Sequence, residues 1–225
     1  MKALQASILI ISIFFCFSAF ATILEVKKEF YDSGELKTET QYIDGIKNGL
    51  ERNYNKDGSL QRETTFIDGE KSGIDKLYNE NGSLLSVTNY KDNKKDGLER
   101  DYYIGENKIM AETTYVDGKK NGTKVLYDLD GTVMIEEKFK NDVRDGITLT
   151  YWGGGELGSE SLFKEGNLLW INEYYRSGFL ERVITFENNK AVSGYLYTED
   201  GKKREMTNAH LHNTNKEIEQ FFKNE

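Results

Sequence analysis

Glutamate is the residue whose spacing in this chain comes closest to a catalytic pattern. Five glutamates recur at intervals of 24 residues or twice that plus one: Glu39, Glu63, Glu112, Glu136 and Glu160. Two carboxylates perform acid–base catalysis only when their environments hold their pKa values apart. A repeated column gives each carboxylate a similar environment, so we interpret these glutamates as structural.

Three further motifs suggest chemistry but lack essential parts. His210 and His212 would place two imidazoles on one face of a strand, yet no third metal ligand has a known position, so a solvated surface is favoured. Residues 153–155 are three glycines without the Gly-Lys-Ser/Thr of a phosphate loop, and residues 128–131 lack the glutamate of a calcium loop. We interpret both segments as turns.

A nucleophile, a base and an orienting group cannot be combined from this sequence. The one cysteine is Cys16, and both histidines lie in the C-terminal tail. We therefore expect a protein that is not an enzyme, with no catalytic residue, metal site or cofactor.

Tyrosine offers the one candidate binding surface. Tyrosines occupy a regular column, and a hydroxyl at the edge of a ring is useful where the ring meets water. The alternative, that these rings pack on each other within the sheet, is equally compatible with the pattern. The candidate binding residues are Tyr54, Tyr78, Tyr102, Tyr127 and Tyr151.

These columns are positioned by a repeat of about 24 residues that runs from about residue 30 to 202. A second aromatic column, expected to pack in the interior, contains Tyr42, Phe66, Tyr90, Tyr115, Phe139, Phe163 and Phe186. A glycine column at turns contains Gly34, Gly58, Gly82, Gly131, Gly155, Gly178 and Gly201, and a further glycine follows the second aromatic by seven residues at Gly49, Gly73, Gly97, Gly122 and Gly146.

One unit, residues 49–71, shows how the repeat folds. A short strand ending at Tyr54 is followed by the turn sequence Asn-Lys-Asp-Gly, and residues 59–67 then alternate between apolar and polar positions. Residues 68–73 are expected to form the closing turn. The sequence predicts an all-β fold of tandem β-hairpins in an elongated, twisted antiparallel sheet, with a short C-terminal helix.

Both ends of the chain differ from the repeat. Lys2, an apolar run over residues 8–17 and the small residues Ala19 and Ala21 are typical of a secretory signal peptide, with cleavage expected after Ala21. Ile218, Phe221 and Phe222 have helical spacing, which predicts a short helix over residues 215–225 that caps the last hairpin. The expected domains are a signal peptide (1–21), a hairpin repeat domain (22–204) and a tail with a capping helix (205–225).

Composition limits the partners. The formal net charge is −8, and no basic stripe offsets it, so nucleic acid is not expected as a partner. Only two tryptophans occur, which weakens the hypothesis of a glycan-binding module built from aromatic clefts.

The repeat resembles the MORN repeat variant of bacteria. The resemblance covers residues from about 30 to 200. The segments that show it are GLERNYNKDGSLQRETTFIDGEKSG, GIDKLYNENGSL and GTKVLYDLDGTVMIEEKFKNDVRDG. The third unit departs from the pattern, with Asn93 in place of the glycine of Gly45 and Gly69, and with Gly105 displaced by one position. The resemblance implies a sheet of hairpins, frequent export or antitoxin-like roles in bacteria, and contacts with proteins or lipids.

The function expected from sequence is an exported, non-catalytic repeat scaffold that binds a protein at the cell envelope or outside the cell. Its location would be the periplasm, the cell surface or the medium. The alternatives are an antitoxin-like or immunity-like protein, and a module of the envelope that binds a glycan or a membrane surface.

Overall fold

The computed structural model describes residues 9–15 and 22–223 of the chain. The predicted cleavage point after Ala21 and Cys16 lie outside the described residues. Within the apolar run, Leu9–Phe15 forms strand β1, which pairs antiparallel with β2 (Thr22–Phe30). The chain divides into two units, and β9 (Ile109–Val116) contributes residues to both.

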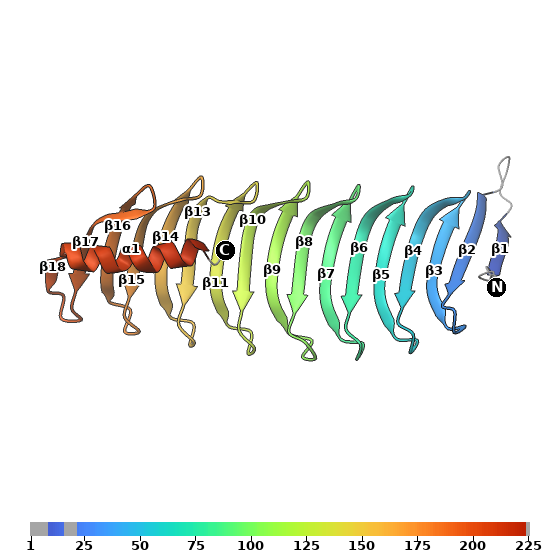
Figure 1. The fold of residues 1–225 in the computed structure, drawn as a ribbon, viewed down its shortest axis with the longest axis horizontal. Helices are drawn as coiled ribbons and strands as arrows, with labels where there is room; N and C mark the ends of the chain where they lie inside the picture. The colour runs from blue at the N-terminus through green and yellow to red at the C-terminus, as the bar shows by residue number, and fades with distance from the viewer. Residues whose placement is uncertain (1–8, 16–21, 224–225) are drawn as a thin grey trace, which may run out of the picture. The chain divides into compact units, whose positions relative to one another are not determined.

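Unit 1 consists of antiparallel strands that pair in sequence order (Figure 1). From β2 onward, short turns join each strand to the next, so these strands lie beside their neighbours in the sequence. After β1 and β2 come β3 (Leu36–Ile43), β4 (Ile46–Tyr54), β5 (Leu60–Ile67), β6 (Glu70–Tyr78), β7 (Leu84–Lys91) and β8 (Lys94–Tyr102).

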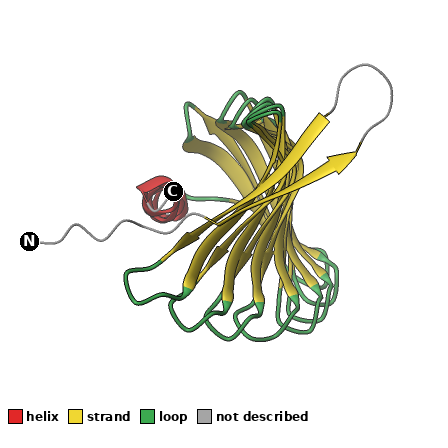
Figure 2. Ribbon diagram, turned by 90° about the vertical axis from the view of Figure 1, so that its right-hand side faces the viewer, coloured by secondary structure: helices red, strands yellow, loops and turns green. Residues whose placement is uncertain are grey.

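Unit 2 continues the same hairpin plan and adds a helix. Its strands are β10 (Lys119–Tyr127), β11 (Val133–Lys140), β12 (Val143–Arg144), β13 (Gly146–Tyr151), β14 (Leu157–Lys164), β15 (Asn167–Tyr174), β16 (Leu180–Glu187), β17 (Lys190–Tyr197) and β18 (Lys203–Glu205). Helix α1 (Asn208–Lys223) lies across one face of the strands of this unit (Figures 1 and 2). The prediction of an all-β fold of antiparallel hairpin repeats with one C-terminal helix is confirmed.

The tight turns of the hairpins have two residues, both with positive φ. Asp44 and Gly45 have φ values of 49° and 80°, and Ile43 pairs with Ile46 on either side of them. This is the type I′ geometry whose twist matches that of the flanking strands. Asn93 has a φ of 65°, so a unit without glycine at this position makes the same turn, since asparagine tolerates the left-handed region.

The prediction that residues 68–73 form one closing turn is wrong. The turn is Asp68-Gly69 alone, because β6 already begins at Glu70 and Ile67 pairs with Glu70. Gly73 instead lies within β6 at a bulge, where the step from Thr64 to Phe66 on β5 faces the longer step from Lys71 to Asp75 on β6. The Gly73 φ is 118°, and a Cβ there would lie 3.0 Å from the Thr65 Cβ. Glycine is therefore needed for both backbone angle and space.

The C-terminal helix begins earlier than predicted, at Asn208 and not near Asn215. Thr207 precedes it, and its backbone N–H donates to the His210 Nδ1 at 3.0 Å, a side-chain contact that fixes the first turn. The histidine pair therefore lies on a helix and not on a strand, and residues two apart on a helix do not share a face.

The hydrophobic core of unit 2 lies between this helix and the sheet. Leu168 and Ile184 are each 1% exposed, and Leu211, Ile218 and Phe222 of the helix pack against their cluster. The remaining buried members are Phe163, Phe186, Ala191 and Met206. The helix thus covers the last hairpins through Ile218 and Phe222, whereas Phe221, the third residue of the predicted helical pattern, is 44% exposed and lies outside the cluster.

Candidate interaction surface

The predicted tyrosine column lies at the strand ends that precede the longer turns. Its five residues end strands β4, β6, β8, β10 and β13 and are all half-buried: Tyr54, Tyr78, Tyr102, Tyr127 and Tyr151. Each therefore exposes part of its ring to solvent while the remainder packs on the strands. The assignment of these residues as binding residues stays a prediction.

Tyrosine and glutamate columns share one face of the sheet. The Tyr127 hydroxyl donates to Glu112 at 2.9 Å, and the Tyr174 hydroxyl donates to Glu160 at 2.7 Å. Desolvation, followed by the hydrogen bond and charge of Glu160, raises the pKa of Tyr174 to about 12. The glutamates thus fix tyrosine hydroxyls in these hairpins, which agrees with a structural role.

The same face carries a ladder of alternating charges across adjacent strands. Glu39 pairs with Arg52 across β3 and β4, and Arg52 pairs with Glu63 across β4 and β5. The Arg52 guanidinium lies 2.9 Å from Glu63 and 3.8 Å from Glu39, and Lys76 lies 3.5 Å from Glu63. Alternating charges on adjacent strands therefore hold neighbouring hairpins together.

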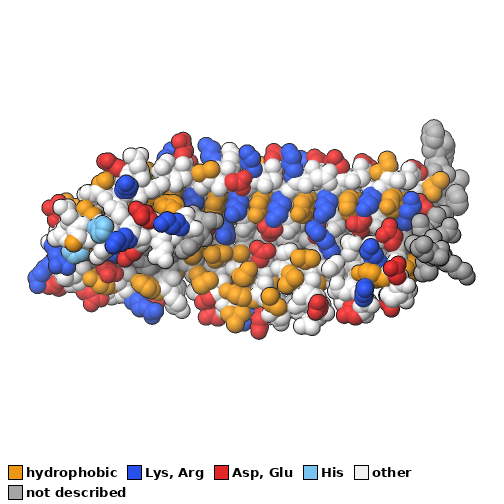
Figure 3. Space-filling view, viewed as in Figure 1, with side chains coloured by type: hydrophobic (Ala, Val, Ile, Leu, Met, Phe, Trp, Pro, Cys, Tyr) orange, Lys and Arg blue, Asp and Glu red, His pale blue; other side chains and the backbone are white. Residues whose placement is uncertain are grey.

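The opposite face of unit 1 carries a row of alternating rings and cations. Successive side chains of a strand point to opposite faces, so Thr64 and Phe66 lie away from Glu63. Lys47 lies 4.8 Å from the centre of the Phe66 ring, Lys71 lies 5.2 Å from that of Tyr90, and Lys95 lies 4.8 Å from that of Tyr115. We call these residues the ring–lysine row. Figure 3 shows alternating hydrophobic and basic side chains across the strands of unit 1.

This row shows how far the second aromatic column packs in the interior. A lysine of the neighbouring strand lies over each ring, and Phe66 pairs directly with Lys71 across β5 and β6. The lysine stems cover the rings while the ammonium groups remain at the surface. Of the predicted interior column, Phe66, Phe163 and Phe186 are buried, and the four other rings are half-buried.

Each lysine of the row has an acidic partner four residues later. Lys47 pairs with Glu51, Lys71 lies 3.2 Å from Asp75, and Lys95 lies 2.5 Å from Glu99. Burial raises the pKa of Glu99, but hydrogen bonds from Lys95 and Tyr115 outweigh it and lower that pKa below the ordinary 4.5. Each lysine of the row therefore has a carboxylate beside it, and the Asp75 carboxylate also accepts a hydrogen bond from Arg62 at 2.7 Å.

The lysines of this row were missed in the sequence interpretation, although a signal was present. Lys47, Lys71, Lys95 and Lys120 precede the bulge glycines by two residues each time. Their spacing is as regular as that of the aromatic columns. The bulge obscures which face they share with the rings, because the regular pairing of the two strands is interrupted there.

No metal centre accompanies this surface. Within residues 22–223, no group of three or more histidine, aspartate or glutamate side chains could hold a metal ion. Among the helices of the described part of the chain, none is long and apolar enough to cross a membrane.

Comparison with known families supports the repeat assignment over part of the chain. The model of the MORN repeat variant matches three consecutive segments, residues 26–44, 47–68 and 71–92. These segments follow the hairpins of β2 to β7 in unit 1. Repeats of this kind commonly mediate contacts with proteins or membranes, which is consistent with a non-catalytic scaffold.

Comparisons with whole proteins add little. No curated protein matches the chain. Among solved structures, the chain is similar to one in "Crystal structure of GtfA/B complex bound to UDP and GlcNAc", at 14% identity and a TM-score of 0.24. The match covers 57% of this chain and 24% of that one, so the chain spans about a quarter of the length of that protein.

Proposed function

We propose that this protein is an exported, non-catalytic repeat scaffold that binds a protein partner at the cell envelope or outside the cell. The observation that carries the proposal is the ring–lysine row of unit 1. It presents rings, cations and acids at a fixed spacing on adjacent strands, which is an extended surface suited to a partner and not a cleft suited to a substrate.

Export rests on the first 21 residues, whose charge, apolar run and small residues follow the plan of a signal peptide. The mature chain contains no cysteine, so its stability outside the cell would come from hairpin packing and ion pairs and not from disulfides. An antitoxin-like role would require that the partner is exported as well.

The two faces of unit 1 can be tested against each other with matched variants. One variant replaces Tyr54, Tyr78 and Tyr102 by Ser, and the second replaces Lys47, Lys71 and Lys95 by Gln. Each is used with the wild-type protein to capture proteins from envelope extract and culture medium. Circular dichroism of both variants verifies that the hairpins remain folded.

We expect a protein that is retained by wild type and lost in the lysine variant, because charged residues of a row confer specificity on a protein contact. Loss in the tyrosine variant alone would place binding on the tyrosine face, as the sequence predicts. Retention of glycan or lipid without any specific protein would contradict the scaffold proposal.

A further inference from the structure

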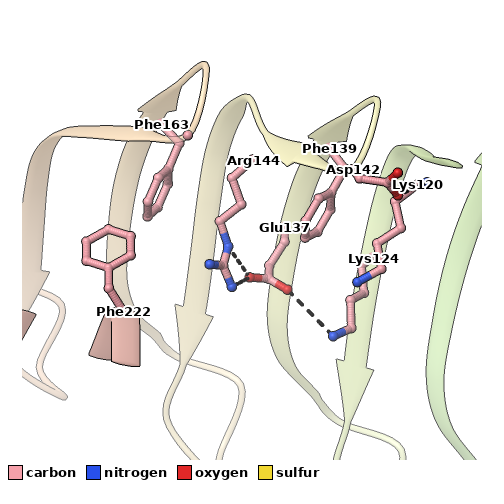
Figure 4. A pocket seen from close by; sticks show the side chains of 9 residues that line it. Lys120, Lys124, Glu137, Phe139, Asp142, Arg144, Phe163 and Phe222 are labelled. Carbon is pink, nitrogen blue, oxygen red and sulfur yellow. Dashed lines mark hydrogen bonds and ion pairs between the residues drawn. The ribbon is translucent and has the colours of Figure 1, made fainter. Parts of the chain in front are cut away.

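A pocket of about 470 Å³ in unit 2 lies where the repeat pattern changes (Figure 4). Phe139, Phe163 and Phe222 supply its apolar wall, the last from the end of helix α1. Its charged side chains are those of Lys120, Lys124, Arg144, Glu137 and Asp142.

The pocket carries one net positive charge in a protein whose formal charge is −8. Three cations line it against two carboxylates, whereas Lys47 and Lys95 of the ring–lysine row each have an acid of their own, and Lys71 shares Asp75 with Arg62. A ligand with a single negative charge would therefore neutralise the pocket. A ligand with two negative charges would leave one of them without a compensating cation.

The excess charge comes from a substitution at one repeat position. Position 124 corresponds to Glu51, Asp75 and Glu99, the acids that pair with the row lysines, but here it is a lysine. Lys120 therefore lacks the partner that its counterparts have four residues later. It lies 5.2 Å from the centre of the Phe139 ring, and its Nζ forms no ion pair with any side chain in the described part of the chain.

A second departure from the repeat pattern places a buried acid next to the two other cations of the pocket, Lys124 and Arg144. Glu137 stands where other repeats have Thr40, Thr64 and Thr88, and it is 5% exposed. Arg144 donates to it through Nε at 2.7 Å and Nη2 at 2.5 Å, and Lys124 lies 3.9 Å from it. Figure 4 shows Arg144 beside Glu137, with the Phe163 and Phe139 rings on either side.

The aromatic side chains hold this ion pair in place. The Arg144 guanidinium lies 5.6 Å from the centre of the Phe163 ring and 5.4 Å from that of Phe221. Because Glu137 fixes Arg144 and engages Lys124, the cation left for a ligand is Lys120, next to an apolar wall.

We propose that this pocket binds a carboxylate that is attached to an aromatic or aliphatic group. Lys120 holds the carboxylate by a charge-assisted hydrogen bond, with Lys124 beside it, and the rings of Phe139, Phe163 and Phe222 contact the apolar group. Two sources share this chemistry: a free aryl or alkyl carboxylic acid, and the C-terminus of a peptide that ends in an apolar residue.

The test uses the full chain and two matched pairs of probes. The first pair is 3-phenylpropionate and its neutral amide, and the second is the peptide Gly-Gly-Leu-Phe with a free and with an amidated C-terminus. Binding is measured by titration calorimetry and by shifts of backbone amide resonances in β10, β11 and α1.

We expect each acid to bind and its amide to bind at least roughly tenfold more weakly, since a hydrogen bond to a charged group is lost. Binding of the peptide acid alone identifies a chain terminus as the source, and binding of the small acid alone identifies a free acid. Equal affinity of acid and amide, or no binding of either acid at millimolar concentration, would overturn the proposal.

Variants separate the pocket from the rest of the cationic surface. Lys120→Gln is expected to weaken acid binding roughly tenfold, because it removes the charge that has no acidic partner. Lys47→Gln is the matched control, since Lys47 occupies the same repeat position but has Glu51 as its own acidic partner, and it should leave acid binding unchanged. An equal loss in both variants would show non-specific charge attraction and would refute the site.

This proposal does not depend on the protein-scaffold function. Unit 1 carries the ring–lysine row, and unit 2 carries the pocket. Loss of partner capture in the lysine variant therefore tests the scaffold, and acid binding by Lys120 tests the pocket.

Discussion

Glycine has two separate roles in this repeat, and they differ at the level of single atoms. Gly131 lies in a turn with a φ of 92° and open space where a Cβ would lie, whereas Gly146 lies within the bulge with a φ of 127°. A Cβ at Gly146 would lie 2.9 Å from the Lys138 Cβ. The sequence shows both glycines as regular columns but not this difference.

We predict that Gly146→Ala lowers the free energy of unfolding more than Gly131→Ala does. Both variants acquire backbone strain of roughly 1–3 kcal/mol, and Gly146→Ala also forces the two strands apart. Chemical denaturation with circular dichroism measures the difference. Equal losses in the two variants would show that contact with Lys138 is unimportant.

At the scale of elements, helix α1 replaces a missing hairpin at the end of unit 2. Within the repeats, a turn residue accepts a hydrogen bond from the preceding hairpin, as when the Leu168 N–H donates to the Asn189 side chain at 2.7 Å. The Ala191 N–H instead donates to the side chain of Asn215, in the helix, at 2.6 Å. The helix therefore supplies the hydrogen-bond acceptor for the Ala191 N–H that a further hairpin would otherwise supply.

We predict that Asn215→Ala destabilises unit 2 by about 1–3 kcal/mol, because it leaves the partly buried Ala191 N–H without its acceptor. Asn213→Ala is the control, since Asn213 is exposed on the same helix. Hydrogen exchange at Ala191 should be faster in the first variant only. Unchanged exchange there would contradict the capping role of Asn215.

Across the whole molecule, the constant period makes each hairpin unit interchangeable with the next. The ring, the lysine, the acid and the bulge glycine recur together, so every hairpin repeat of unit 1 makes the same contacts with the next repeat. Stability in such an arrangement is close to a sum over units and their interfaces.

We predict that deletion of residues 73–96, one full period, preserves the fold and lowers the free energy of unfolding. Gly97 then takes the place of Gly73, and all columns stay in phase. Deletion of residues 73–84, half a period, should abolish cooperative unfolding because it places rings opposite turns. Thermal denaturation followed by circular dichroism compares them, and equal behaviour of both deletions would contradict periodic stabilisation.

The sequence by itself determined the repeat period, the hairpins, the turn glycines and the presence of a terminal helix. These features follow from local chemistry: alternation defines a strand, and positive φ selects glycine, asparagine or aspartate. The resemblance to the MORN repeat variant rests on the same local pattern, and the family model matches it over three repeats.

Only the tertiary structure decided which side chains share a face and which charges meet. The bulge at Gly73 and its equivalents interrupts the regular pairing of two strands. Counting residues along the sequence therefore does not show which ring each lysine of the row contacts. The pocket depends on contacts between β10, β11, β12, β14 and the distant helix residue Phe222. Such contacts join positions far apart in the chain, and local periodicity contains no information about them.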